Sequence, residues 1–270
     1  MPAGSERIGL HDIQASADTR EIALQRVGVK DIAVPLRVQT RGGGFQAVQA
    51  TCALTVGLPK EFKGTHMSRF VEILAEWQRR NMSGACVEDL VREIRDRLDA
   101  PAAGALIRFR YFVDKAAPAT GAVAPTDLDC SFEGDIALDG TYRFTLGVAV
   151  PVTTLCPCSK AISRYGAHNQ RSLITARVRC RTGTCTWIED LAAALEARAS
   201  CPVYPLLKRE DEKVVTEQAY ENPKFVEDVL RDCILYLRSL SGIEWFSLEV
   251  ENFESIHNHN AWATHEEWVG

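Results

Sequence analysis

Two short segments of the chain concentrate residues that could hold a metal ion. The segment TTLCPCSKAISRYGAHNQR carries Cys156 and Cys158 on either side of Pro157, and His168 follows twelve residues after Cys156. The later segment ENFESIHNHNAW adds Glu251, Glu254, His257 and His259. Thiolate, imidazole and carboxylate groups are the ligands that zinc and related ions take in proteins. The residue types indicate a metal site, with two alternatives: the cysteines pack at a strand end, and HNHN is a solvated loop.

The spacing of the two cysteines indicates how they would be used. Cys-x-Cys is shorter than the Cys-x-x-Cys pair of a zinc knuckle, so both sulfurs could bind one ion only with a tight turn at Pro157. We therefore expect one cysteine as a ligand and the other as its neighbour. A single cysteine with separated histidine and glutamate residues leaves an open coordination position, which is typical of a catalytic rather than a structural metal.

Polar and basic residues surround the cysteine segment. The stretch SRYGAHNQR brings together more hydrogen-bond donors than a core segment could leave unpaired, so it is not expected in the core. The basic residues of this part of the sequence are Lys160, Arg164, Arg171, Lys208, Arg209 and Lys213. Alone they could form a solvated charge run, whereas beside a metal site they favour phosphate binding.

The composition excludes several classes of protein. The chain has 270 residues, 46% hydrophobic and 25% charged, which suits one large domain or two small ones sharing a core. Its formal net charge of -5 argues against a general nucleic-acid binder. No apolar run predicts a membrane span and the N-terminus has no signal-peptide pattern, so we expect a cytoplasmic protein. The nine cysteines are expected mostly as small buried residues rather than as disulfides.

The hydrophobic pattern of the first half predicts strands and two helices. Residues 1–30 are polar and irregular and are expected to form an arm. Strands are expected at 31–40, 45–58, 105–116 and 128–152. The first two form a hairpin around the RGGG turn. Apolar residues at helical spacing predict a helix over 65–80 with Thr65 as its N-cap, and a second helix at 87–100 that stops before Pro101.

The second half repeats this order. It is expected to hold a hairpin at 172–188 with Gly183 in its turn, a short helix at 189–199 and a strand at 243–254. A longer helix over 223–240 is expected to start with Asn222 as N-cap and Pro223 as its first residue. Two such repeats, with helices on one face of the sheet, predict an α+β fold.

Seven segments in order resemble the type IB GTP cyclohydrolases. They are KGTHMSRFVEIL, TTLCPCSK, YGAHNQRS, VYPLLKR, DEKVVTE, YENPKFVEDVLRD and NFESIHNHNA, and the likeness runs from about Asp12 to the C-terminus. The resemblance implies a tunnelling fold of two tandem antiparallel-sheet modules, residues 1–150 and 151–270, each with a helical pair on one face. It also implies a homotetramer with active sites at subunit interfaces. The implied reaction converts GTP and water to 7,8-dihydroneopterin 3'-triphosphate and formate, the first step of tetrahydrofolate biosynthesis.

The resemblance also implies roles for individual residues. The metal, which can be manganese, zinc or iron in this family, would be held by Cys156, His168, Glu212 and His257. Glu210 stands where a proline is common in the family, and it is an alternative to Glu212. Catalysis would fall to Cys156, His168 and Glu254. Substrate binding would fall to Glu227, which matches the carboxylate that grips the guanine edge, and to Lys160 and Arg171.

These roles combine into an expected mechanism. Opening the imidazole ring of guanine requires water to add at C8 and the resulting formamide to be cleaved. The metal would activate the water, His168 would ligate the metal or carry a proton toward N7, and Glu254 would act as a base or orient His257. The alternatives are a relative that makes the cyclic-phosphate dihydropterin from GTP, a metal-free nitrile reductase of queuosine synthesis, and a purine-binding module without activity.

Overall fold

The computed structural model describes residue 14, residues 16–181 and residues 186–269. Its strands are β1 (Leu24–Gln39), β2 (Phe45–Leu58), β3 (Asn81–Met82), β4 (Ala103–Ala116), β5 (Val123–Ile136), β6 (Tyr142–Leu155), β7 (Asn169–Cys180), β8 (Cys201–Pro202), β9 (Ile243–Asn252) and β10 (Ala261–Trp268). Its helices are α1 (Met67–Trp77), α2 (Gly84–Arg97), α3 (Pro157–Ile162), α4 (Ile188–Glu196), α5 (Arg209–Glu221) and α6 (Val226–Ser239). The expected α+β class is therefore confirmed.

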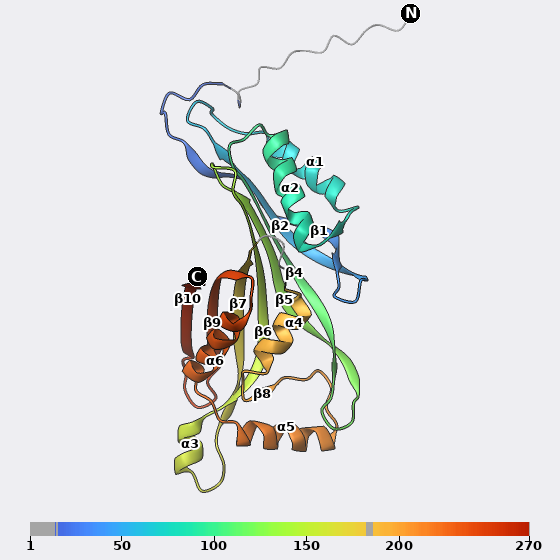
Figure 1. Cartoon of the computed structure of the whole chain (residues 1–270), viewed down its shortest axis with the longest axis vertical. Helices are drawn as coiled ribbons and strands as arrows, with labels where there is room; N and C mark the ends of the chain where they lie inside the picture. The colour runs from blue at the N-terminus through green and yellow to red at the C-terminus, as the bar shows by residue number, and fades with distance from the viewer. Residues whose placement is uncertain (1–13, 15, 182–185, 270) are drawn as a thin grey trace, which may run out of the picture.

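The strands form one continuous sheet. Their order is β10-β9-β7-β6-β5-β4-β2-β1-β3, and the short β8 pairs with β6. Every pairing is antiparallel except that of β1 with β3. Figure 1 shows α1 and α2 toward one end of this elongated sheet, and α3 and α5 at the opposite end. The ends of β6 and β7 that flank the cysteine segment therefore lie at the α3 and α5 end.

One apolar face of the sheet carries the core of both halves. Six neighbouring strands place buried residues in one cross-strand row, namely Ala50, Phe109, Cys130, Val148, Ala176 and Leu248. Because side chains alternate between faces along a strand, residues two positions away extend the same apolar face. Helices α2, α4 and α6 pack against it. The approach of α2 is close, since a Cβ added at Gly134 of β5 would lie 2.6 Å from Val87 Cγ1.

The interpretation of most cysteines as packing residues is confirmed for four of them. Cys52, Cys130, Cys201 and Cys233 are buried. Burial raises the pKa of the Cys130 and Cys233 thiols to about 12, so these groups stay protonated and inert at neutral pH. Cys185 lies outside the described residues.

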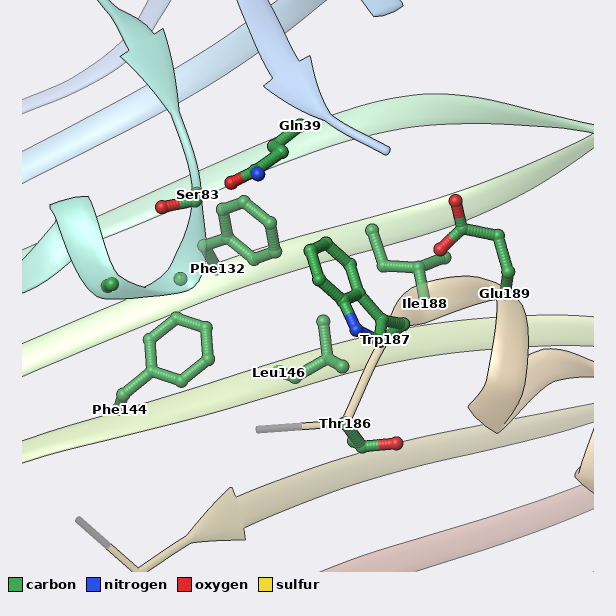
Figure 2. A pocket seen from close by; sticks show the side chains of 11 residues that line it. Gln39, Ser83, Phe132, Phe144, Leu146, Thr186, Trp187, Ile188 and Glu189 are labelled. Carbon is green, nitrogen blue, oxygen red and sulfur yellow. The ribbon is translucent and has the colours of Figure 1, made fainter. Parts of the chain in front are cut away.

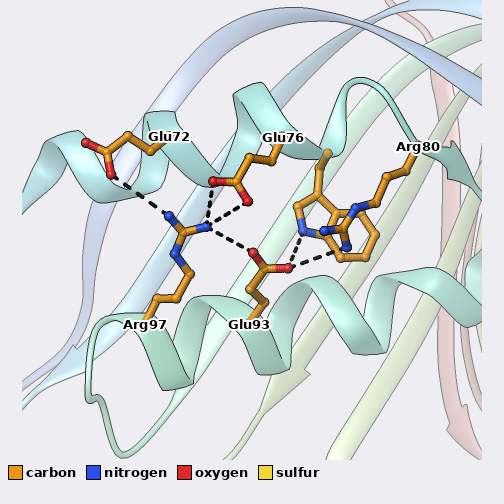
Figure 3. Close-up of polar contacts among 6 residues, drawn as sticks. Glu72, Glu76, Arg80, Glu93 and Arg97 are labelled. Carbon is orange, nitrogen blue, oxygen red and sulfur yellow. Dashed lines mark hydrogen bonds and ion pairs between the residues drawn. The ribbon is translucent and has the colours of Figure 1, made fainter.

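An ion network joins α1 to α2 on the side that faces away from the sheet. Arg97 Nη1 donates to Glu76 at 3.0 Å and to Glu93 at 3.1 Å, and Glu93 also accepts a 2.8 Å hydrogen bond from Trp77 Nε1 (Figure 3). The Arg80 guanidinium lies over the Trp77 ring, 4.4 Å from its centroid. The shared partners fix the spacing of the two helices, which the apolar stripes of the sequence alone do not specify.

Two details predicted for the first half are wrong. Strand β1 begins at Leu24, so residues 24–30 are not part of an irregular arm. Register shifts in the pairing of β1 with β2 interrupt the alternation of polar and apolar residues there, which hid the strand in the sequence. Thr65 is not the N-cap of the first helix, because α1 begins at Met67 and His66 occupies that position. The hairpin over 31–40 and 45–58 is confirmed.

Two details of the second half are also wrong. The hairpin predicted for 172–188 does not form, because β7 pairs with the distant strands β6 and β9 and the chain enters α4 at Ile188. Gly183 lies outside the described residues. Asn222 and Pro223 do not start a helix: Asn222 is the C-cap of α5, and α6 begins at Val226. The Asn222 side chain donates instead to the Ala199 carbonyl oxygen at 2.9 Å.

Within the described residues, no helix is both long enough and apolar enough to span a bilayer. Position 150 lies inside β6, and the division into modules 1–150 and 151–270 stays a prediction. In the second half, α4 and α6 cover the sheet, while α5 contacts β6 and β8 at the end of the molecule (Figure 1).

Candidate active site

Cys156 and His168 lie at the neighbouring ends of two paired strands. The pairing of β6 with β7 ends at Leu155 and Asn169, and α3 with its following loop forms the connection between them. One more backbone hydrogen bond, from Cys156 N to the His168 carbonyl oxygen at 3.1 Å, extends the ladder. The two residues are twelve positions apart in sequence and yet belong to one local unit.

The turn into α3 places the two cysteines in different surroundings. Cys156 is the N-cap of α3, and its Sγ accepts a hydrogen bond from Ser159 N at 3.4 Å. Ser159 Oγ donates to the Cys156 carbonyl oxygen at 3.1 Å and accepts from His168 N at 3.2 Å. Cys158 lies inside the helix and is exposed. Residues two apart on a helix do not face each other, so this geometry favours Cys156 alone as a ligand.

The His168 ring contacts a second segment of the chain. Its Nδ1 lies 3.0 Å from Gln170 Oε1 and 3.4 Å from Ser255 Oγ. Ser255 follows β9, and the backbone N–H of Phe253 donates to the Arg171 carbonyl oxygen at 2.9 Å. The start of the ENFESIHNHN segment is thereby attached to β7, which begins directly after His168.

The histidines of this segment lie further out. His257 and His259 are exposed, and their rings stack with centroids 5.2 Å apart. Glu254 is half-buried, and Glu251 accepts a 2.7 Å hydrogen bond from Asn260 Nδ2. Across the described parts of this single chain, no three histidine, cysteine or acidic side chains come together as a metal group. The pair Cys156 and His168 is thus the local unit that the structure assembles, and His257 and Glu212 are not joined to it within one chain.

The buried carboxylate of the REDE segment is Asp211, which sequence reasoning missed. Its oxygens accept hydrogen bonds from the backbone N–H groups of Ala119, Thr120 and Lys208 at 2.8 to 2.9 Å. Burial alone would raise the pKa of Asp211, but these donors together hold it well below its usual range. Asp211 therefore fixes the β4–β5 turn to the start of α5. An aspartate at the third helical position is a capping signal that could have identified it.

The two glutamates weighed as metal ligands flank this anchor. Glu210 and Glu212 are both exposed on the first turn of α5. Glu212 N donates to the Lys208 carbonyl oxygen at 2.9 Å, so its backbone is already helical. The structure leaves both carboxylates available, and the choice between them stays a prediction.

The start of α6 is bonded to the cysteine segment. Lys224 N donates to the Leu155 carbonyl oxygen at 3.0 Å, next to Cys156, and Lys224 Nζ donates to the Arg198 carbonyl oxygen at 2.7 Å. Glu227 is the second residue of α6 and is exposed. These contacts fix the backbone of Glu227 relative to that of Cys156, although the predicted N-cap was wrong.

The basic residues differ in how far they are already engaged. Lys160 Nζ donates to the Tyr220 carbonyl oxygen and lies over the Tyr220 ring, 4.2 Å from its centroid. Lys213 pairs with Glu217 at 3.0 Å. Arg171 projects from β7 and is exposed. Lys160 would have to break its contacts with Tyr220 in order to bind a phosphate. The Arg171 side chain makes no such contact within the described residues, so it would bind a phosphate without this loss.

A cavity of about 270 Å³ lies elsewhere, between the start of α2 and the start of α4 (Figure 2). Its walls include Phe132, Phe144, Leu146 and Trp187, and Glu189 lies at its edge. None of the residues predicted for the site lines it. Glu189 there accepts a 2.6 Å hydrogen bond from the Tyr111 hydroxyl, which is a contact between β4 and α4.

Comparisons with known sequences show which family this chain resembles. The family model described as type I GTP cyclohydrolase folE2 matches residues 10–263. GTP cyclohydrolase FolE2 of Geobacter sulfurreducens is 50% identical over 256 residues, covering 95% of this chain and 97% of the relative. GTP cyclohydrolase FolE2 of Azoarcus sp. (strain BH72) is 49% identical over 252 residues, covering 93% of both chains.

Solved structures agree on the architecture. The highly active BTUO mutant P287G, a urate oxidase, aligns over 91% of this chain and 100% of its own length, with a TM-score of 0.50 and 9% sequence identity. A likeness at this level of identity shows the shared tunnelling fold alone. With the family model covering nearly the whole sequence, the chain belongs to the type I GTP cyclohydrolase FolE2 family.

Proposed function

We propose that this chain converts GTP and water to 7,8-dihydroneopterin 3'-triphosphate and formate, as the first step of tetrahydrofolate biosynthesis. The matching relatives, which align over almost their whole length, carry the name GTP cyclohydrolase FolE2. The observation that supports the site is the local unit of Cys156 and His168, with the start of α6 bonded to Leu155. Through these backbone hydrogen bonds the Cys156 thiol, the His168 imidazole and the start of the helix that carries Glu227 are attached to the same strand end.

The proposal includes a divalent metal ion, which would be manganese, zinc or iron. The residues present fit such an ion, because sulfur and imidazole nitrogen are donors that these metals accept. The Nδ1 edge of His168 faces Gln170, which leaves its Nε2 edge for the ion. His257 and Glu212, with Glu210 as the alternative, are proposed as the remaining ligands. When bound, the ion would act as a Lewis acid and activate the water.

The chain's own residues would bind the substrate and move protons. Glu227 would accept two hydrogen bonds from guanine N1–H and the 2-amino group, which selects guanine over adenine. Arg171 would hold the triphosphate, and Lys160 would join it after leaving Tyr220. As water adds at C8, His168 would hold the ion through Nε2 or, where the other ligands hold it, carry a proton on Nε2 toward N7, and Glu254 would accept a proton or orient His257.

The proposed assembly is a homotetramer in the cytoplasm, with sites completed at subunit interfaces. Strand β10 at one end of the sheet, and β1 beyond the two residues that pair with the short β3 at the other, leave sheet edges that a second copy would cover. Two residues proposed for the site, Glu227 and His257, are exposed in the single chain, as residues that meet a neighbouring subunit would be. Light scattering at micromolar concentration tests this proposal, and a fully active monomer would contradict it.

Product analysis tests the proposed reaction. The metal-loaded protein is incubated with GTP, and the pterin product, formate and remaining GTP are separated and quantified. We expect one formate and one 7,8-dihydroneopterin 3'-triphosphate for each GTP consumed. A cyclic-phosphate product would assign the chain to the other reaction on GTP, and unchanged GTP would remove the proposed activity.

A further inference from the structure

A line of buried polar side chains runs from His168 into the sheet. Gln170 Nε2 donates to Thr154 Oγ1 at 2.8 Å, the Thr154 and Ser172 hydroxyl oxygens lie 2.8 Å apart, and Ser172 Oγ donates to Asn252 Oδ1 at 2.7 Å. These four side chains come from β6, β7 and β9 and have relative exposures of 7%, 0%, 1% and 4% in the order Gln170, Thr154, Ser172, Asn252. They lie on the same face of the sheet as the buried residues Val148, Ala176 and Leu248, so this core face becomes polar beside His168.

The number of hydrogens fixes the direction of every bond in this line. Ser172 has one hydroxyl hydrogen and gives it to Asn252 Oδ1, which can only accept. The contact between Ser172 and Thr154 must therefore use the hydrogen of Thr154, whose oxygen in turn accepts from Gln170 Nε2. The Gln170 amide thus turns its oxygen toward His168, and that oxygen can only accept.

We propose that this line of hydrogen bonds locks His168 in the tautomer that carries its proton on Nδ1. The Nε2 atom then presents a lone pair, which is the state needed to bind a metal ion or to take a proton. Gln170 and Thr154 are positioning residues that act through His168. The catalytic consequence rests on the proposed function, whereas the tautomer itself is a property of the protein without substrate or metal.

The tautomer can be read directly from the full-length protein. Histidine is labelled with ¹⁵N, and long-range ¹H–¹⁵N spectra are recorded at a pH where the ring is neutral, without metal and again with Zn²⁺. The His168 signals are identified by their absence in His168→Asn. We expect a protonated Nδ1 and an unprotonated Nε2 in both spectra, with Zn²⁺ shifting only Nε2. A protonated Nε2 in the metal-free wild type overturns the proposal without any further variant.

A matched pair of substitutions at Thr154 tests the proposal at a residue that is two hydrogen bonds away from the His168 ring. Thr154→Val keeps the side-chain shape but removes the hydroxyl that holds Gln170, so His168 should become a mixture of tautomers and bind Zn²⁺ about 10- to 100-fold more weakly. Thr154→Ser keeps the hydroxyl and should keep the single tautomer. A folded Thr154→Val protein with an unchanged His168 spectrum would overturn the proposal. If the tautomer is as proposed but Zn²⁺ leaves Nε2 unshifted, the lock stands and the metal site is wrong.

Discussion

Replacing Glu227 by glutamine separates a substrate-binding role from a structural one. Glu227 is exposed in the first turn of α6, and its side chain makes no hydrogen bond or ion pair within the described residues. Its contribution to folding is then limited to the favourable position of a negative charge at a helix N-terminus, about 0.3–1 kcal/mol. The free energy of unfolding should therefore change by less than about 1 kcal/mol in Glu227→Gln.

The expected effect on catalysis is much larger. Glutamine turns one acceptor oxygen into a donor that faces a donor of guanine, and a charged bidentate interaction is lost. This should cost about 2–4 kcal/mol of transition-state binding, or on the order of 30- to 1000-fold in kcat/KM for GTP. Steady-state formate release and denaturant unfolding, measured on the same preparation, give both quantities.

The neighbouring aspartate provides a matched control. Asp228 Oδ2 accepts a hydrogen bond from Phe225 N at 3.1 Å, and Asp228 pairs with Arg231 at 3.1 Å, so this carboxylate stabilises the start of α6. Asp228→Asn removes the same charge from the same helical turn and should cost about 0.5–1 kcal/mol of stability, with a small change in kcat/KM. Wild-type kcat/KM in Glu227→Gln, or an equal loss in both variants, would refute the assignment of Glu227 to guanine.

Three further predictions follow from the site and from the fold. Cys156→Ala should lose several orders of magnitude of formate release while Cys158→Ala keeps most of it, and equal losses would show that the roles of the two cysteines are wrongly divided. Because the pKa of Asp211 is lower in the folded protein than in the unfolded chain, its stabilising effect is present above about pH 3.9 and is lost as the pH falls toward the folded pKa. The stability difference between wild type and Asp211→Asn should therefore shrink in acid unfolding curves, and a constant difference would contradict this. Gly134→Ala should cost about 1–3 kcal/mol in denaturant unfolding, since the new Cβ would lie 2.6 Å from Val87 Cγ1, and an unchanged stability would show that α2 can move.

The sequence indicates Cys156 and His168 as parts of one site only through their residue types and the resemblance. The structure adds the reason for their closeness, which is the antiparallel pairing of β6 with β7. Turn signals gave the wrong partner for β7, because they predicted a hairpin after Ser172. The partners of β7 are β6 and β9, and β9 lies some seventy positions further along the chain, beyond the range of any turn signal.

Asn222 and Asp211 show that tertiary contacts can replace a capping role or add to it. Asn222 followed by Pro223 is a favoured helix start, but here the amide donates to the Ala199 carbonyl oxygen and helix α6 starts later. Asp211 accepts a hydrogen bond from Lys208 N at the start of α5 and another from Thr120 N, about ninety positions away in the sequence. The local sequence is compatible both with a helix cap and with a hydrogen bond to a distant segment. Only the fold therefore decides which of the two such a side chain makes.

The hydrogen-bond line behind His168 could not be predicted at all. Thr154, Gln170 and Ser172 look like ordinary polar positions on two strands, and Asn252 lies eighty positions after Ser172. Their burial and their mutual contacts depend on the register of three strands. A shift of one residue in either pairing would turn these side chains to the opposite face.

The most direct test of this account is formate release from GTP by protein from which metal has been removed. The protein is treated with a chelator, freed of it, and assayed before and after addition of Mn²⁺, Zn²⁺ or Fe²⁺, with bound metal quantified in each sample. We expect no formate without metal, recovery in proportion to bound metal in the wild type, and no recovery in Cys156→Ala. Full formate release by metal-free wild-type protein would contradict a metal-dependent site built on Cys156 and His168.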